Sequence, residues 1–475
     1  MRDQNDLRRA AAEGCAESRL LLTRRAMLGV TAGLFSAAYL PRDAMAADGD
    51  ARLLVVVLRG GTDGLSVVVP TGDRDYERLR RDIAIPTSAT IKLDSDFGLH
   101  PALKTFGKLF AKNEAAVVHA TCVPLRNRSH FDCQDNLENG LPGIGAVNST
   151  GWLNRLLSAL PSGDPVAKRG AIQVGEAPLI LRGPAPVLGW SPTWFTPVGR
   201  DVRRPLLSVY DEIDRPLYSA LTRGIEANNL ALKSDASDDA DVSALRKGFR
   251  GAGHLLAEPN GPRIAVLSVG NWDTHSGQGA AEGFLADRLI ELDDALADFR
   301  KAVGSAWKKT VVICATEFGR TARVNGDSGT DHGVGTVALL AGGAVAGGKV
   351  YGDWPGLAPS KLFEDSDLKA TTDLRAVFKG VLRGHLDVPA GMLDKSIFPD
   401  SAKIAPLTAL VAGGSRERVS SAADTGRPVR QRPLPPIARY RAKQAGGSRG
   451  RRPARAGACR LGGGALSRGG RRGRG

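Results

Sequence analysis

The chain has 475 residues, with 65 Lys and Arg against 50 Asp and Glu, and a formal net charge of +15. A charge this positive ordinarily indicates a nucleic-acid or anionic-membrane partner. However, residues 413–475 hold 17 basic and two acidic side chains, which leaves 48 of each sign in the rest of the chain. The body is therefore neutral, and we expect no nucleic acid as its partner.

The first 46 residues predict a twin-arginine export signal. Arg24 and Arg25 precede an apolar run, Leu28–Leu40, and the small residues Ala44–Ala46 form a cleavage site. The run is shorter than the ~20 residues that cross a bilayer. The alternatives are an ordinary Sec signal or a chance arginine pair before a core helix. We expect a mature chain from about Ala47, without a transmembrane span, that meets the twin-arginine translocase and acts in the periplasm or outside the cell.

The body, residues 47–412, shows strand and helix patterns in alternation. Short apolar runs rich in β-branched residues indicate strands buried on both faces of a parallel sheet. These runs are Leu53–Leu58, Ala115–Ala120, Arg263–Val269 and Thr310–Ala315. The stretch Glu282–Val303 has helical spacing of its apolar residues, whereas 161–205 indicates loops and short strands and 235–241 an acidic surface loop. The pattern predicts an α/β fold with a central, mostly parallel sheet sandwiched by helices.

Polar residues follow each predicted strand, where open α/β sheets bind ligands. Carboxylate and imidazole ligands suit Zn²⁺, Mn²⁺, Mg²⁺ or Ca²⁺, and one or two such ions would stabilise charge on a transferring phosphoryl or sulfuryl group. Taken singly, each residue could equally be a cap or a turn residue. Together they predict a shared metal site. The candidate ligands are Asp63, Asp273, His275, Glu317, Asp331 and His332.

Ser129 begins a predicted helix, Ser129–Gly140, as a natural N-cap. A hydroxyl at a helix N-terminus beside Arg126 and Arg128 could also be a nucleophile next to an anion-binding site. The residues leave both interpretations open. We expect four further histidines to be structural, and these are His100, His119, His254 and His385; for His100 and His119 a role as ligand is the alternative.

Cysteine usage excludes a disulfide or zinc-finger framework, because the body has three cysteines and no CxxC pair. A Cys122–Cys133 bridge is left open. The tail, 413–475, is rich in Arg and Gly and lacks apolar periodicity, so we expect disorder. It is either an arm that binds nucleic acid or an anionic polymer, or GC-rich sequence read in the wrong frame.

Eight motifs together carry a family resemblance across most of 47–412. They are Leu58-Arg59-Gly60-Gly61-Thr62-Asp63-Gly64-Leu65, Phe97-Gly98-Leu99-His100-Pro101, Arg128-Ser129-His130-Phe131-Asp132, Gly151-Trp152-Leu153-Asn154-Arg155, Trp272-Asp273-Thr274-His275, Ala315-Thr316-Glu317-Phe318-Gly319-Arg320-Thr321, Asp331-His332-Gly333 and Tyr351-Gly352-Asp353-Trp354-Pro355-Gly356-Leu357. The body resembles the exported bacterial domain-of-unknown-function family 1501. That family is similar to the alkaline phosphatase and sulfatase superfamily, which implies that fold and a bivalent metal site.

The resemblance also implies roles for single residues. Asp63 matches the superfamily's first metal-binding Asp, Ser129 falls near its nucleophile, and Asp273 with His275 resembles its Asp/His metal pair. Glu317 stands where an Asp is expected, Phe318 where a His would be, and His332 could be the late metal-binding His. Arg128 and Arg320 complete the expected catalytic group with Ser129.

The implied function is a metal-dependent hydrolase of phosphate or sulfate esters, acting on a small anionic ester or an envelope polymer. A non-catalytic envelope protein that binds an anionic ligand in the same cleft is the alternative, because fold does not determine chemistry.

Overall fold

The computed structural model describes residues 51–144, 150–176, 178–192, 200–231 and 242–412. The predicted export signal, the acidic loop at 235–241 and the Arg/Gly-rich tail lie outside the described residues. Within the described residues, no helix combines the length and the apolar character that crossing a membrane requires.

The largest sheet of the described residues has nine strands, eight of them in the order β13-β5-β12-β9-β1-β8-β6-β7, with β14 paired to β5. Every neighbouring pair is parallel except the two that β12 makes with β5 and β9. The strands are β1 (Arg52–Leu58), β5 (Ala115–Cys122), β6 (Ala171–Val174), β7 (Leu188–Trp190), β8 (Ile264–Val269), β9 (Thr310–Thr316), β12 (Thr336–Ala341), β13 (Lys349–Tyr351) and β14 (Thr372–Asp373). This mixed, mostly parallel sheet confirms the predicted fold class.

The four predicted strands are β1, β5, β8 and β9, and the predicted helices are α12 (Phe284–Val303) and α6 (His130–Asn139). Ser129 is the N-cap of α6, and Gly140 ends that helix in the left-handed conformation at φ 66°. The region 161–205 contains β6, β7 and short helices. β12 lies outside the predicted strands, although all six of its residues are buried.

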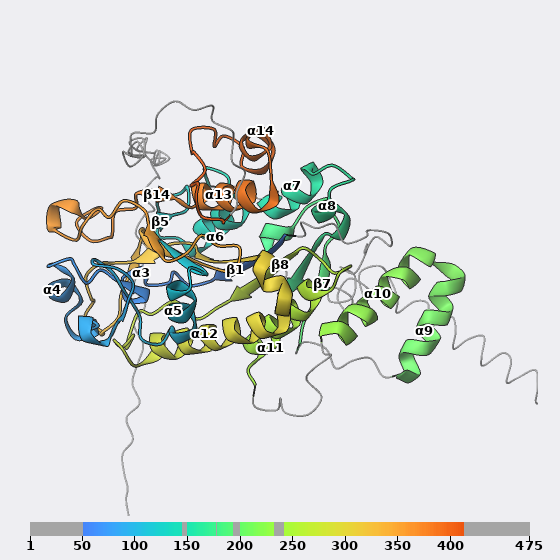
Figure 1. Cartoon of the computed structure of the whole chain (residues 1–475), viewed down its shortest axis with the longest axis horizontal. Helices are drawn as coiled ribbons and strands as arrows, with labels where there is room; N and C mark the ends of the chain where they lie inside the picture. Colours follow the sequence, from blue (N-terminus) through green and yellow to red (C-terminus); the bar gives the residue numbers. More distant parts are fainter. Residues whose placement is uncertain (1–50, 145–149, 177, 193–199, 232–241, 413–475) are drawn as a thin grey trace, which may run out of the picture. The chain divides into compact units, whose positions relative to one another are not determined.

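Helices cover both faces of the sheet (Figure 1). Leu54, Val56 and Leu58 of β1 pack with α5 (Lys104–Ala111), α11 (Ala244–Ala257) and α12. The alternate residues Leu53 and Val55 pack on the opposite face with α6, α7 (Trp152–Ala159) and α13 (Leu374–Leu386). A strand buried on both faces needs apolar residues at nearly every position. The sequence of β1 is therefore a continuous apolar run and not an alternation of apolar and polar residues. Each such side chain contributes roughly 1.5–3 kcal/mol by its burial.

Smaller elements complete the described part of the chain. A three-stranded sheet has the order β2-β4-β3, and β10 pairs with β11 in antiparallel fashion. The bounds are β2 (Val68–Val69), β3 (Ile91–Lys92), β4 (Gly98–Leu99), β10 (Gly319–Arg320), β11 (His332–Gly333), α3 (Gly64–Val67), α4 (Tyr76–Arg80), α8 (Pro165–Arg169), α9 (Arg200–Ile213), α10 (Arg215–Ala231) and α14 (Ala390–Met392), with short 3-10 or π turns at Arg81–Ile83, Thr87–Ala89, Leu179–Leu181, Gly304–Lys309, Pro359–Lys361 and Leu393–Ile397.

The histidines expected to be structural each meet a backbone carbonyl. His100 Nε2 lies 2.9 Å from the oxygen of Ala280, and His119 Nε2 lies 3.0 Å from that of Val68. His254 lies 3.2 Å from the oxygen of Ala231 and His385 lies 2.8 Å from that of Arg52. Cys122 and Cys133 are free thiols, as is Cys314, so the bridge left open by the sequence does not form.

Candidate metal centre

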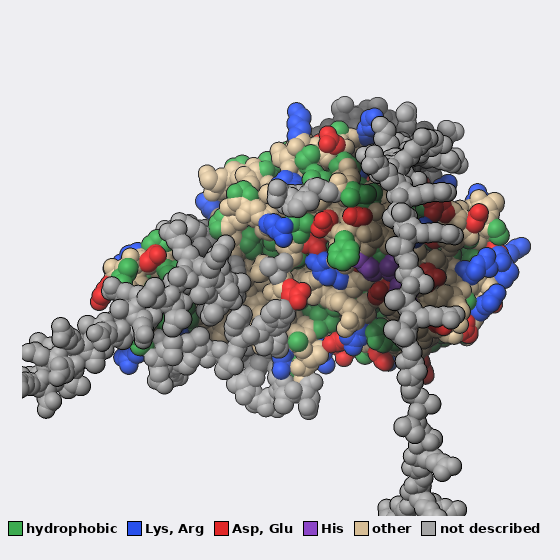
Figure 2. Space-filling view, turned by 180° about the vertical axis from the view of Figure 1, so that it is seen from behind, with side chains coloured by type: hydrophobic (Ala, Val, Ile, Leu, Met, Phe, Trp, Pro, Cys, Tyr) green, Lys and Arg blue, Asp and Glu red, His purple; other side chains and the backbone are tan. Residues whose placement is uncertain are grey.

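The sheet topology brings the polar segments to one edge. β9, β1 and β8 are adjacent and parallel, and β5 points the same way because β12 runs antiparallel to both β5 and β9. The carboxyl ends of these four strands therefore meet at a single edge, where ligands bind in open sheets of this kind. In Figure 2, histidine side chains reach the surface beside acidic and basic groups.

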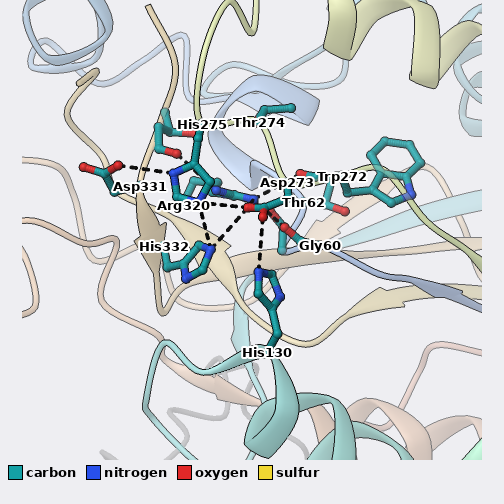
Figure 3. Close-up of polar contacts among 12 residues, drawn as sticks. Gly60, Thr62, His130, Trp272, Asp273, Thr274, His275, Arg320, Asp331 and His332 are labelled. Carbon is teal, nitrogen blue, oxygen red and sulfur yellow. Dashed lines mark hydrogen bonds and ion pairs between the residues drawn. The ribbon is translucent and has the colours of Figure 1, made fainter. Parts of the chain in front are cut away.

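Asp273, which follows β8, is the centre of the site (Figure 3). Its Oδ1 lies 3.0 Å from His275 Nε2 and 3.2 Å from His332 Nε2, and it accepts a hydrogen bond from Arg320. Its Oδ2 lies 3.4 Å from His130 Nε2. Burial raises the pKa of this carboxyl, but the hydrogen bond and charge of Arg320 outweigh it, so the pKa lies below its usual range. Asp273 is thus an anion at neutral pH.

All three imidazoles have their Nδ1 atoms occupied by acceptors. His130 Nδ1 lies 2.9 Å from Glu317 Oε1, and His332 Nδ1 lies 2.9 Å from the backbone oxygen of Arg128. His275 Nδ1 lies 3.3 Å from Asp331 Oδ1. A carbonyl or an ionised carboxylate can only accept, so each Nδ1 carries a proton, and in a neutral ring the lone pair is then on Nε2. In the neutral form of the three rings, the Nε2 lone pairs would face the Asp273 carboxylate.

In that form, Arg320 is the side chain that donates to Asp273. His275 Nε2 lies 3.0 Å from His332 Nε2, where two neutral, Nδ1-protonated rings would bring two lone pairs together. His130 Nε2 is buried and makes no hydrogen bond with any described residue. Ligand atoms of His130, Asp273 and His332 all lie within 4.8 Å of one another. Imidazole nitrogens and a carboxylate that converge in this way can bind a cation, and an acceptor on the Nδ1 side of each ring is typical of metal-binding histidines.

Arg320, expected in the catalytic group, is fully buried and holds the loops of the site together. Its Nε donates to the oxygen of Gly61 at 2.6 Å, and its Nη1 donates to that of Thr330 at 3.1 Å. Its Nη2 bonds Asp273 and the oxygen of Gly60. The donors of this guanidinium are directed at protein oxygens, so Arg320 fixes the position of the Asp273 carboxylate.

The turn after β1 requires glycine at two positions. Gly60 has φ 124°, and a Cβ there would lie 2.6 Å from the backbone nitrogen of Asp273. Gly61 has φ 73°, and its Cβ would run into the ring of Phe318. Phe318 is buried and packs against two rings of the site, with centroid distances of 4.7 Å to His130 and 4.9 Å to His332. A carbon surface therefore occupies the position at which the resemblance would place a second ligand.

His130, Asp273, His275 and His332 are called the convergent group below. Glu317 and Asp63, both expected as ligands, lie outside this group. Glu317 is fully buried and bonded to His130. Asp63 caps α3 and is fully buried, with Oδ2 paired to Arg80 and accepting from Gln278 at 2.7 Å. An anion already neutralised by a buried arginine has less need of a metal. Asp331 meets the group only through His275, and its side chain is 63% exposed.

Ser129 and Arg128 stand at the start of α6, beside the site. The Ser129 hydroxyl accepts from the backbone nitrogen of Asp132 at 3.4 Å, which is the N-cap geometry. The Arg128 guanidinium donates to Asp367 at 3.0 Å and to Glu364 at 2.8 Å. Its backbone oxygen meets His332. In this structure Arg128 therefore contributes to the site through its carbonyl.

His130 was absent from the candidates, although it belongs to the convergent group. It lies in a polar run, Arg126–Asp132, in which hydrophobic periodicity gives no direction for the side chains. The available signal was its place directly after the N-cap serine, since the first turn of a helix that follows β5 faces the same sheet edge. Gln134, four residues on, also meets Glu317 (3.0 Å) and so lies on the same face of α6.

Several solved structures are similar at low identity. The phosphonate monoester hydrolase of Agrobacterium radiobacter is 10% identical with a TM-score of 0.34, covering 77% of this chain and 78% of that one. The C-terminal periplasmic domain of EcEptC from Escherichia coli, in complex with Zn, is 10% identical with a TM-score of 0.26, covering 64% and 76%. A protein in the alkaline phosphatase superfamily from Vibrio parahaemolyticus is 13% identical with a TM-score of 0.26, covering 68% and 69%. Likenesses this weak carry no argument about the site.

A comparison with curated proteins finds no match. A family model does match, over residues 50–394, and its description is "Protein of unknown function (DUF1501)". The matched range contains every residue of the convergent group. Because it covers well over half of the sequence, the chain belongs to the DUF1501 family.

Proposed function

We propose that the protein is a metal-dependent hydrolase of phosphate or sulfate esters that acts in the periplasm or outside the cell. The observation that carries the proposal is the convergence of His130, Asp273 and His332, with His275 at the rim. Three imidazole lone pairs and a carboxylate suit Zn²⁺ or Mn²⁺ better than Mg²⁺ or Ca²⁺, which prefer oxygen ligands alone. The described residues present one such group, which supports one ion.

The residues around this group have separate tasks in the proposed reaction. A bound bivalent ion would supply positive charge opposite the charge that develops on the phosphoryl or sulfuryl group. Arg320 holds Asp273 in place, and the carbonyl of Arg128 holds His332. Ser129 is our candidate nucleophile, because the N-terminus of α6 favours the negative charge that its attack on the ester would create.

The test uses purified full-length protein, aryl phosphate and aryl sulfate esters, and a measurement of bound metal. We expect a bivalent ion that a chelator removes together with the activity, and that restores the activity when added back. Ser129→Ala should lower turnover at least 100-fold with the ion still bound, and should cost about 1 kcal/mol in stability through the lost cap. Ser158→Ala, on the exposed side of α7, is the matched control and should leave turnover unchanged.

Other outcomes contradict parts of the proposal. Protein that binds no bivalent ion would refute the metal centre. Activity that persists in Ser129→Ala, with reduced stability, would leave Ser129 as a helix cap and place the nucleophile elsewhere.

A second candidate is a non-catalytic protein that binds an anionic ligand at the same edge. The observation that weighs against catalysis is the engagement of Arg128 by two carboxylates and of Arg320 by Asp273 and backbone carbonyls, which leaves neither arginine directed at a substrate. In such a protein the bound ion itself would attract the anion. This candidate predicts that metal-loaded protein binds inorganic phosphate or sulfate but hydrolyses neither class of ester.

A further inference from the structure

We propose that Glu317, Gln134 and Arg59 form an orienting relay for His130, and that Glu317 is a positioning residue and not a metal ligand. The relay holds the imidazole with its Nε2 lone pair facing Asp273. The inference rests on the proposed function only in giving His130 the role of a ligand, since the relay itself consists of contacts within the protein.

The first step is that both oxygens of the Glu317 carboxylate are engaged by groups of the protein. Its Oε1 accepts from the backbone nitrogen of Gly60 at 2.8 Å, His130 Nδ1 at 2.9 Å and Gln134 Nε2 at 3.0 Å. Its Oε2 accepts from the Thr316 hydroxyl at 2.9 Å. The side chain is fully buried, so it cannot turn without breaking these bonds. A backbone N–H group, a side-chain amide and a hydroxyl all donate to this side chain, so it acts as an acceptor.

The second step is that the direction of the Gln134 amide is determined by Arg59. Arg59 Nη1 donates to Gln134 Oε1 at 2.9 Å. A guanidinium has no acceptor, so the amide oxygen must face Arg59 and the amide nitrogen must face Glu317. Arg59 is itself held by Ser268, whose hydroxyl lies 2.6 Å from Nε, and by an ion pair with Glu138.

The third step is that this directed chain selects one tautomer of His130. Because Glu317 can only accept, His130 must place its proton on Nδ1, and the lone pair is left on Nε2. A ligand histidine whose tautomer is set in advance needs no rearrangement when a metal binds. Partners of this kind typically change metal affinity 10- to 100-fold when removed.

The experiment observes His130 in metal-free, full-length protein by long-range ¹H–¹⁵N NMR of labelled histidines, above pH 8. The chain has seven histidines, and the His130 signals are identified by their loss in His130→Asn. In the unmodified chain we expect the proton on Nδ1. Glu317→Ala should shift a substantial fraction of His130 to the Nε2-protonated form, whereas Glu317→Gln should keep the Nδ1 form because its amide oxygen can still accept.

Gln134→Leu provides a second break in the relay if Glu317→Ala fails to fold, and it should also increase the Nε2-protonated fraction. The matched control is Asp293→Asn, which alters a buried carboxylate that accepts from the backbone of α5 at 2.7 and 2.9 Å, and it should leave His130 unchanged. If neither Glu317→Ala nor Gln134→Leu alters the tautomer, the relay is refuted.

Metal titration separates a positioning residue from a ligand. We expect at least tenfold weaker binding of Zn²⁺ by Glu317→Ala and a change below threefold in Glu317→Gln. Equal losses in the two variants would make Glu317 a ligand and overturn the inference. If the unmodified chain binds no Zn²⁺, the proposed function fails, whereas the tautomer measurement still decides the relay.

Discussion

Asp273 is the residue on which the other groups of the candidate site depend. It meets three imidazoles and Arg320, yet its side chain is 43% exposed, so it contributes to the site more than to the core. We expect Asp273→Asn to weaken binding of a bivalent ion at least 100-fold, because the amide has lost the negative charge and directs two N–H donors at lone pairs or at Arg320. The measurement is metal content and titration of the purified variant.

The control for this prediction is Asp331→Asn, since Asp331 meets the group only through His275 Nδ1, at 3.3 Å. Its variant should retain the ion, with affinity reduced by less than tenfold. Retention of full affinity by Asp273→Asn, in a folded protein, would show that the ion does not bind at this carboxylate.

Residue types alone do not distinguish ligands from their supports. Asp63, Asp273 and Glu317 are all carboxylates that follow predicted strands, and the sequence treats them alike. The structure separates them by their partners. Asp63 is paired with Arg80, 17 residues away, because α4 returns to the start of α3, whereas Asp273 faces imidazole nitrogens. Pairings of this kind form between side chains from different segments of the chain, so a local sequence pattern cannot predict them.

At the scale of elements, His119 links β5 to the three-stranded sheet. Its Nε2 donates to the oxygen of Val68 in β2, and its Nδ1 accepts from the backbone nitrogen of Ala120 at 2.8 Å. The ring also packs on Phe97 and Trp354, at centroid distances of 5.2 and 4.7 Å. A second proton on Nδ1 would face the N–H group of Ala120, so this environment disfavours the charged form of the ring.

This environment predicts a pH dependence of stability. Burial lowers the pKa of His119 from its ordinary value of 6.5 to about 4. A histidine whose pKa is depressed by folding stabilises the fold above the unfolded pKa, and this contribution is lost as the pH falls from 6.5 towards 4. The loss should be of the order of 3 kcal/mol, at about 1.4 kcal/mol for each pKa unit.

Urea unfolding at several pH values between 7 and 4.5 measures this effect. The comparison is with His119→Gln, which has no proton to gain and should be less stable at pH 7 with a weaker dependence on pH. His100 and His385, whose pKa values burial also lowers, are unchanged in the variant. Identical pH slopes in the two proteins would contradict the prediction.

Helix α6 shows which features of an element a sequence contains. Ser129 at the N-cap and Gly140 in the left-handed conformation determine where the helix begins and ends, and both signals are local. The orientation of the helix is not local. It follows from packing Cys133 and Leu137 against the sheet, which directs His130 and Gln134 towards Glu317.

At the scale of the whole molecule, the last described residues before the basic tail are bonded to the body. Ala412 donates to the oxygen of Ala344 at 2.8 Å, and Val411 forms a bridge with Val345. We therefore expect truncation after Ala412 to change the free energy of unfolding by less than about 1 kcal/mol, as for surface changes away from the core. Thermal and urea unfolding of the truncated and full chains test this. A larger loss would place the tail among the residues that stabilise the body.

The predicted export signal can be tested in the cell. Replacing Arg24 and Arg25 together by Lys keeps the charge but removes the arginine pair on which the predicted twin-arginine signal depends. We expect unprocessed precursor to accumulate in the cytoplasm, observed by fractionation and by the mass of the chain. Replacing Arg8 and Arg9 by Lys is the matched control and should leave export normal. Normal processing of the first variant would indicate the Sec route.

Much of the architecture was determined by the sequence itself. The runs that became β1, β5, β8 and β9 are continuous and apolar because both faces of these strands are covered, and their parallel directions then place the segments that follow them at one edge. The same reasoning predicts a site at that edge that includes Asp273, His275 and His332. Both inferences depend on chain-local patterns and on the geometry of parallel sheets.

Only the tertiary structure decided which of these side chains converge. It places His130 close to Asp273 and His332, pairs Asp63 with Arg80, and directs the donors of Arg320 at Asp273 and at backbone carbonyls. It also surrounds Glu317 with donors from the turn after β1, from α6 and from β9. The physical reason is that a buried charged group must be paired or hydrogen-bonded. Its partners come from segments that are distant in the sequence and become neighbours only in the folded chain.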